Sequence, residues 1–209
     1  MNRQFSRLAL ALLLTSTSST FAASRTDLTV TGLITPTACE PTLTDGGIVD
    51  YAKIPVKDLN TSGPTLLETK TLQLTVSCNG PASFAISALD NRANTSHYDS
   101  ALHYGLGKIN ETEKLGGYSM ELRDLVADVP VTPLNSRDEG ATWTVGDGLF
   151  DKRDWKGFGT RTGGNWAPVA LQSLAANLFV TAYIAPTDGL TLTNEVKLDG
   201  AATLQIEYL

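Results

Sequence analysis

The sequence predicts an all-β fold in which two sheets pack face to face. Short segments along the chain alternate apolar and polar residues, the pattern of strands with one buried face. Clusters of Gly, Asp, Asn and Pro separate these segments. The longest stretch of good helix formers, residues 111–128, is divided by Gly116-Gly117. Together these features are typical of a β-sandwich.

Seven segments carry the strand pattern, through alternation or through β-branched and aromatic content. They are 28–34, 72–76, 83–87, 178–184, 190–192, 196–198 and 203–209. Turn signals between them are Asp45-Gly46-Gly47, Asn79-Gly80-Pro81, Asp188-Gly189 and Asp199-Gly200.

The middle of the chain, about residues 90–166, gives weaker signals. Its composition shifts toward Gly, Asp, Asn and Arg, so we expect an elaborated loop region within the same domain. Residues 120–125 could form a turn or two of helix. A strand is equally consistent, because Tyr118, Met120 and Leu122 alternate with polar residues.

The first 23 residues have the features of a secretory signal peptide. Arg3 and Arg7 precede an apolar run, Leu8 to Leu14, and small residues follow at 22–24. Seven apolar residues are too few to span a bilayer, which needs about 20. We therefore expect an exported protein that is not an integral membrane protein, cleaved after residue 22, 23 or 24.

The remainder is long enough for one domain with a sizeable core. Removing Arg3 and Arg7 lowers the Lys and Arg count from 16 to 14 against 22 acidic residues, so the net charge changes from -6 to -8. An acidic chain without a basic cluster lacks the electrostatic surface for nucleic acid. We expect no nucleic-acid partner.

Cys39 and Cys78 are the two cysteines of the chain. In an oxidising compartment an even number of cysteines usually indicates a disulfide, so we expect these two to be joined. Their separation is unlike the C-x-x-C spacing of redox pairs.

The residues give no catalytic or metal-binding pattern. His97 and His103 are six positions apart, which does not fit a helical metal pair, and no nucleophile motif is present. We expect no enzyme activity, no metal and no cofactor.

Three tryptophans, Trp143, Trp155 and Trp166, lie in a Gly-rich stretch with Arg and Asn nearby. Large aromatic residues can fix a long loop by packing onto a sheet. Exposed aromatic rings beside polar groups can also hold a sugar. Both interpretations stay open for these three residues.

Residues 203–209 alternate up to the penultimate Tyr208. No turn or charged residue follows to protect the edge of such a strand, so we expect another segment to cover it.

Together, the alternating segment before Gly32, the two cysteines and the alternating strand with its penultimate tyrosine resemble subunits of bacterial chaperone–usher fimbriae. The resemblance is concentrated in residues 24–90 and 174–209. The long middle region resembles the less studied fimbrial-like proteins more than a compact pilin. The resemblance implies an incomplete immunoglobulin-like sandwich (35–209), preceded by a donor-strand-like segment (24–34).

The resemblance also implies roles for individual residues. Leu28 and Val30 would fill a neighbouring subunit's groove. Gly32 would lie at a narrow point of that groove, where any side chain would clash. Four residues of the last strand would form the acceptor edge that pairs with a chaperone: Leu204, Ile206, Tyr208 and Leu209. The disulfide would join the first two strands of the sandwich.

The function implied is that of a structural fimbrial subunit, which uses a periplasmic chaperone and an outer-membrane usher and ends in a surface fimbrium beside neighbouring subunits. Since the segment before Gly32 is short and offers only Leu28 and Val30 as large apolar side chains, this chain is better suited to accept a strand than to donate one. One alternative is a glycan-binding adhesin or tip subunit that uses the loops of residues 143–166. Another is a periplasmic protein that fills its own groove.

Overall fold

A computed structural model describes residues 28–31 and 38–209. The chain divides into two units, Met1–Ile34 and Thr35–Leu209. In the first unit, the described residues 28–31 form no regular secondary structure. The expected signal peptide, 1–23, and Gly32 lie outside the described residues.

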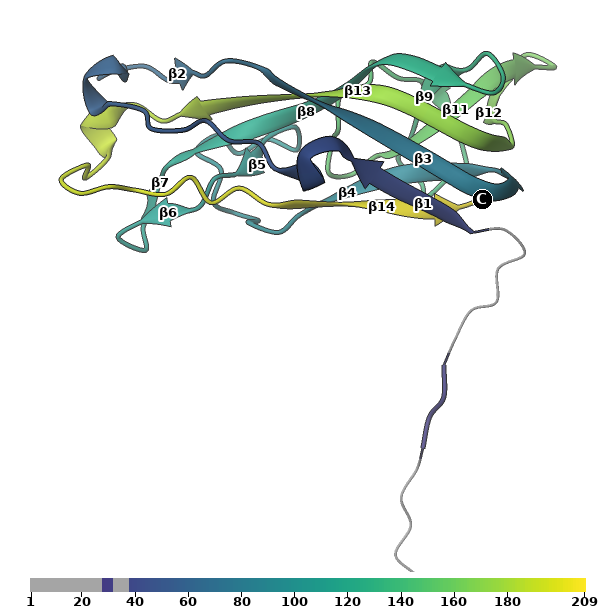
Figure 1. Ribbon diagram of the computed structural model, residues 1–209, viewed down its shortest axis with the longest axis horizontal. Coiled ribbons are helices and arrows are strands. Elements are labelled where there is room, and N and C mark those ends of the chain that lie inside the picture. The colour runs from purple at the N-terminus through teal and green to yellow at the C-terminus, as the bar shows by residue number, and fades with distance from the viewer. Residues whose placement is uncertain (1–27, 32–37) are drawn as a thin grey trace, which may run out of the picture. The chain divides into compact units, whose positions relative to one another are not determined.

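The second unit is an antiparallel β-sandwich, as predicted (Figure 1). One sheet has the order β1 (Cys39–Leu43), β3 (Lys70–Ala82), β13 (Leu171–Ile184), β8 (Gly116–Ala127) and β5 (Tyr104–Gly105), and β2 (Thr65–Leu66) also pairs with β13. The other has the order β10 (Thr144–Val145), β9 (Thr132–Ser136), β11 (Trp155–Thr162), β4 (Phe84–Asp90) and β14 (Ala202–Tyr208), and β12 (Asn165–Pro168) pairs with β11.

The remaining elements are small. β6 (Lys108–Ile109) and β7 (Glu113–Lys114) form a hairpin, and three short 3₁₀ turns cover Thr44–Gly47 (η1), Val56–Asp58 (η2) and Thr187–Gly189 (η3). In the described part of the chain, no helix is of a length and apolarity that would cross a bilayer.

The core lies between the two sheets and follows the alternation of the sequence. In β3, Leu72, Leu74 and Val76 are buried while the residues between them face outward. On the other sheet, Phe84 and Ile86 point into the same cluster. Side chains at every second position of a strand share one face, so this alternation fixes which face is buried.

The strand order corresponds to that of an immunoglobulin sandwich. There, strands A, B, E and D form one sheet, and C, F and G form the other. Here β1, β3, β13 and β8 stand in the A-B-E-D order, and β4 and β14 pair as C and F do. Among the described residues, none pairs with the second edge of β14, where strand G would lie.

The segments 190–192 and 196–198, predicted as strands, have no regular secondary structure in this fold. Their side chains alternate as in a strand, but a strand also requires a neighbour to pair with, and none of the described segments provides one. The prediction of two strands was therefore wrong, although the side chains do alternate between half-buried and exposed positions.

The middle of the chain is more regular than the expected loop region. It contains eight of the strands, β5 to β12, and β8 is a central member of its sheet. The strand interpretation of residues 118–122 is confirmed, because Tyr118, Met120 and Leu122 are buried on one face of β8. These residues form a strand because they pair with β13, which is distant in the sequence. The composition of the segment alone does not reveal this pairing.

Cys39 and Cys78 form the predicted disulfide. They are direct partners in the register of β1 and β3, the first strand and its neighbour in the sheet. The disulfide therefore fixes the short β1 strand to the sheet.

Replacing both Cys39 and Cys78 by serine should lower the free energy of unfolding by about 4 kcal/mol, from the loop-closure entropy of a separation of 39 residues. Urea unfolding followed by circular dichroism measures this loss. Reduction of the unmodified protein should reproduce it, and a double variant as stable as the oxidised protein would contradict it.

Candidate functional site

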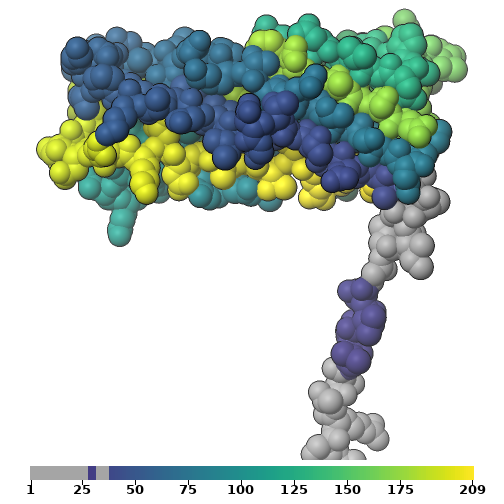
Figure 2. Space-filling view, viewed as in Figure 1, coloured from purple at the N-terminus to yellow at the C-terminus, as the bar shows by residue number. Residues whose placement is uncertain are grey.

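A large groove separates two extended segments of the second unit. We name residues 48–59 the N-terminal lip and residues 190–201 the C-terminal lip. The groove between them has a volume of about 1300 Å³. Figure 2 shows the C-terminal segment, in yellow, running alongside the N-terminal segment, in dark blue.

The floor of the groove is the inner face of the first sheet. Its side chains are apolar and come from β3, β8, β13, the link between β5 and β6, and the residue between β7 and β8: Leu72, Leu106, Leu115, Tyr118, Met120, Leu178, Val180, Ala182 and Ile184. Burial raises the pKa of the Tyr118 phenol, which keeps the floor uncharged. The floor of the groove is therefore part of the sandwich core.

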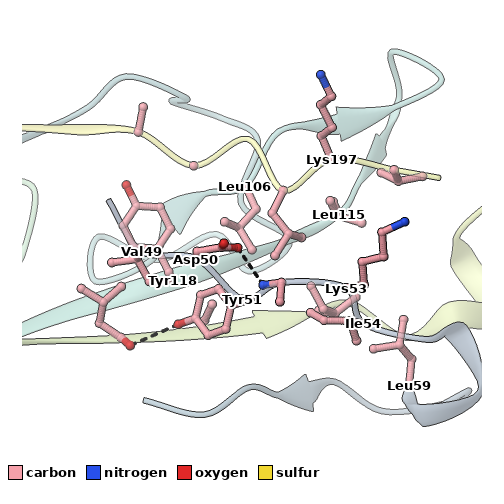
Figure 3. A pocket seen from close by; sticks show the side chains of 18 of the residues that line it. Val49, Asp50, Tyr51, Lys53, Ile54, Leu59, Leu106, Leu115, Tyr118 and Lys197 are labelled. Carbon is pink, nitrogen blue, oxygen red and sulfur yellow. Dashed lines mark hydrogen bonds between the residues drawn. The ribbon is translucent and has the colours of Figure 1, made fainter. Parts of the chain in front are cut away.

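Both lips direct apolar side chains toward this floor. Half-buried residues of the N-terminal lip include Val49, Tyr51 and Ile54 (Figure 3). Those of the C-terminal lip include Val196 and Leu198. The Tyr51 hydroxyl donates a hydrogen bond of 3.2 Å to the carbonyl oxygen of Val180. The C-terminal lip has the alternating side chains of a strand without forming one, whereas the apolar residues of the N-terminal lip are spaced less regularly.

The backbone of the C-terminal lip is held at its two ends. The amide of Thr191 donates to the Glu113 carboxylate (2.6 Å), and the amide of Asp199 donates to the carbonyl oxygen of Leu106 (3.2 Å). Between these two points, the backbone of residues 192–198 makes no hydrogen bond to any other described residue. An extended segment with free amides and carbonyls can pair with an added strand.

The groove is closed at both ends. At one end, the amide of Cys39 donates to the Tyr208 hydroxyl (2.7 Å), which joins β1 to β14. At the other end, the amides of Thr187 and Asp188 donate to the carbonyl oxygens of Asn60 and Thr61, both at 3.1 Å. An occupant would therefore lie between these two closures.

One ion pair crosses the mouth of the groove. Lys53 of the N-terminal lip and Glu195 of the C-terminal lip are 2.9 Å apart, and their side chains are 90% and 89% exposed. An exposed pair of this kind contributes at most about 1 kcal/mol. It therefore does not keep the lips together against an incoming segment.

The C-terminal strand holds the residues predicted as the acceptor edge. Leu204 and Ile206 are half-buried against the core, and Leu204 lines the groove. Tyr208 contributes its hydroxyl to the closure at Cys39. The amide of Leu209 donates to the carbonyl oxygen of Ser83 (3.1 Å), which continues the pairing with β4.

The Trp-rich stretch does not form a single cluster. Trp143 lies over Gly157 of β11, where an added Cβ would come within 2.5 Å of the indole. Trp143 and Trp155 both lie beside Gly140, as does the side chain of Leu209. All three tryptophans are half-buried, and Trp166 lies apart on β12, opposite Arg161 of β11.

The predicted donor residues Leu28 and Val30 are 88% and 85% exposed. They belong to the first unit, and the residues that line the groove belong to the second. Within the described residues, no group of three or more His, Cys, Asp or Glu side chains could hold a metal ion.

Comparison with known proteins gives a family and two relatives. Residues 28–103 match the family described as "Protein of unknown function (DUF1120)". This stretch is similar to that family. It contains β1, the N-terminal lip, β3 and β4, and so includes one wall of the groove.

The chain is 27% identical to Protein GltF of Escherichia coli (strain K12), over 88% of this chain and 88% of that protein. It is 25% identical to the uncharacterized protein YhcF of the same organism, over 90% of this chain and 92% of that protein. The similarity therefore extends over most of the sandwich.

The N-terminal lip was not recognised from the sequence. Val49, Tyr51 and Ile54 are spaced too irregularly for a strand pattern, and proline follows at position 55. The remaining signal is an apolar content that is high for a segment between two turn regions.

Replacing Tyr208 by phenylalanine should remove the acceptor for the Cys39 amide and lower the free energy of unfolding by about 1 kcal/mol. Chemical denaturation measures the change. Tyr98→Phe is the control, because Tyr98 also has an exposed ring but its hydroxyl has no recorded partner among the described residues. Equal stability of Tyr208→Phe and the unmodified protein would show that this closure contributes nothing.

The turn that carries Trp143 should depend on an ionised Asp138. Thr142, through its amide and hydroxyl, and the Ser136 hydroxyl donate to this carboxylate, and they lower its pKa to about 2. A lowered pKa means that the ionised form stabilises the turn above the unfolded pKa of about 3.9, and that this contribution is lost as the pH falls toward 2.

An NMR titration of Asp138 should give this low pKa, and Thr142→Val should raise it toward the ordinary range. An ordinary pKa for Asp138 in the unmodified protein would contradict the hydrogen-bond pattern.

Proposed function

We propose that this protein is a structural subunit of a bacterial surface fimbria and that its groove accepts a β-strand from another polypeptide. The observation that carries the proposal is the unpaired edge of β14 and its continuation, the C-terminal lip, beside an apolar groove of about 1300 Å³. This is the position that strand G occupies in a complete sandwich.

A strand suits the groove better than a small molecule does. The volume is above the range of roughly 300–1000 Å³ that is usual for ligand pockets. The unpaired backbone of residues 192–198 supplies donors and acceptors along the groove, and the floor supplies apolar contacts. Strand addition uses both: main-chain hydrogen bonds give affinity, and alternate side chains enter the pockets.

The proposal assigns an order of partners. After export, a periplasmic chaperone would occupy the groove, and the outer-membrane usher would then exchange the chaperone strand for a segment of a neighbouring subunit. A head-to-tail contact of this kind does not close on itself, so it produces a fibre. The fibre would stand on the cell surface.

The segment around Leu28 and Val30 is this chain's own candidate donor. Both side chains are large, apolar and exposed. With only two large side chains before Gly32, the segment would contribute less to a neighbour's groove than the groove itself can accommodate. A position at a fibre tip, or an accessory role, agrees with this imbalance.

The glycan-binding alternative gains no specific support from the tryptophans. Trp143 packs on Gly157 and Trp166 lies elsewhere, so the three rings do not form one surface. Their contacts fit a role in fixing loops onto the sheet.

A tethered strand tests the proposal directly. A Gly/Ser linker of about ten residues, with a mean span of roughly 17 Å, would follow Leu209 and end in a copy of residues 28–34. We expect the thermal midpoint to rise by at least about 6 °C, because burying two or three large side chains stabilises by about 1.5–3 kcal/mol each.

The matched control carries the same extension with aspartate in place of Leu28, Val30 and Ile34 in the copy, and it should give no rise. Equal midpoints for both extensions would refute strand acceptance. If deletion of residues 24–34 from the unextended chain destabilised it at a concentration where it is monomeric, the protein would be filling its own groove, and the exchange proposal would fail in favour of that alternative.

A further inference from the structure

A buried lysine lies against an asparagine carboxamide in the second sheet, away from the groove. Lys156 of β11 is 2% exposed, and its Nζ donates a hydrogen bond of 2.8 Å to Oδ1 of Asn135 on β9. The two residues are direct partners in the antiparallel register, so their side chains share one face of the sheet.

The surroundings of this pair are mostly apolar. On the other side of Lys156, its register partner in β4 is Ile86, which is 1% exposed. Phe158, two residues further along β11, points to the same face and is also buried. An ammonium group is poorly solvated in such a place, and burial lowers the pKa of Lys156.

Three aspartates, Asp154, Asp147 and Asp151, act on the amine through their charges, and Asp154 does so most strongly. Asp154 is buried, and its Oδ2 lies 3.8 Å from Nζ of Lys156. Its Oδ1 accepts a hydrogen bond of 3.0 Å from Nε of Arg137, which holds the carboxyl group in place. The site therefore contains an amine, a carboxamide and a carboxyl group that can transfer protons.

We propose that Lys156 and Asn135 form a covalent amide cross-link between β11 and β9, made by the folded chain itself. The hydrogen bond to Oδ1 brings Cγ of Asn135 to within about 4 Å of Nζ, since a carbonyl bond measures about 1.2 Å. Fixed proximity of this kind replaces a bimolecular encounter and can lower a barrier by several kcal/mol.

The reaction balances without an oxidant or a cofactor. The Lys156 ammonium transfers one proton to Asp154, and the neutral amine attacks Cγ of Asn135. The Nζ–Cγ bond forms, the bond from Cγ to the amide nitrogen breaks, and one proton passes from the attacking to the leaving nitrogen. Ammonia leaves and takes the proton from Asp154, so the products are a secondary amide and ammonium.

The backbone near β10 packs closely against the reacting carboxamide. An added Cβ on Gly146 would lie 2.8 Å from Cγ and 2.3 Å from Oδ1 of Asn135. A glycine at this position lets the chain pack against the carboxamide and limits its rotation. The alternative is that no covalent bond forms. In that case Lys156 is a buried lysine that donates a hydrogen bond to Asn135 and forms an ion pair with Asp154.

Mass spectrometry of the folded full-length protein separates these two cases. The cross-link lowers the mass by one ammonia, about 17 Da, and blocks tryptic cleavage after Lys156, because trypsin requires a free lysine. We expect one branched peptide that joins residues 124–137 to residues 154–161. Separate linear peptides, with cleavage after Lys156 and an intact Asn135, would overturn the proposal.

Variants show which groups are required. Lys156→Met and Asn135→Ala should each abolish the branched peptide, and Asp154→Ala should abolish or strongly reduce it in protein that still contains the disulfide. Lys108→Met is the matched control, since it removes an exposed lysine elsewhere and should leave the branched peptide unchanged. Because the readout is a covalent bond in β9 and β11, failure here would leave the groove proposal intact.

Discussion

The sandwich depends on the free edge of β14. This strand pairs with β4 on one side. On the other side, the described chain gives it one hydrogen bond, from the Cys39 amide to the Tyr208 hydroxyl at one end. A neighbouring strand would hydrogen-bond to the backbone of β14 and would also cover apolar side chains of the core. Its absence from the described chain therefore leaves backbone groups without partners and an apolar groove. The two lips partly cover the core, but they cannot supply the missing hydrogen bonds.

The rest of the fold compensates for this opening. The long strands β3, β8 and β13 form a continuous apolar floor, and the disulfide fixes β1, the first strand of the groove wall, to β3. The second sheet is extended by β9, β10, β11 and β12, away from the groove. The strands away from the groove are thus paired with neighbours, whereas β14 lacks a neighbour at the groove among the described residues. A protein that is completed by a strand from another chain would have this arrangement.

A few charged side chains are buried although most of the core is apolar. Lys156, Asp154 and Asp151 are buried in and beside the second sheet, away from the groove, each with a polar or charged partner. Buried charges contribute little to stability unless their partners are well placed, and they can fix a particular arrangement of strands. In β9 and β11 this arrangement brings an amine and a carboxamide into contact.

The sequence by itself determined the fold class, the disulfide and the strands that have complete alternation, because side-chain period and cysteine count are local properties. It did not determine the secondary structure of residues 190–198, which alternate like a strand but have no neighbouring strand among the described residues. It also missed the N-terminal lip and the contact between Asn135 and Lys156. Only the tertiary structure decided these, since a groove and a cross-strand pair arise when segments far apart in the chain are placed side by side.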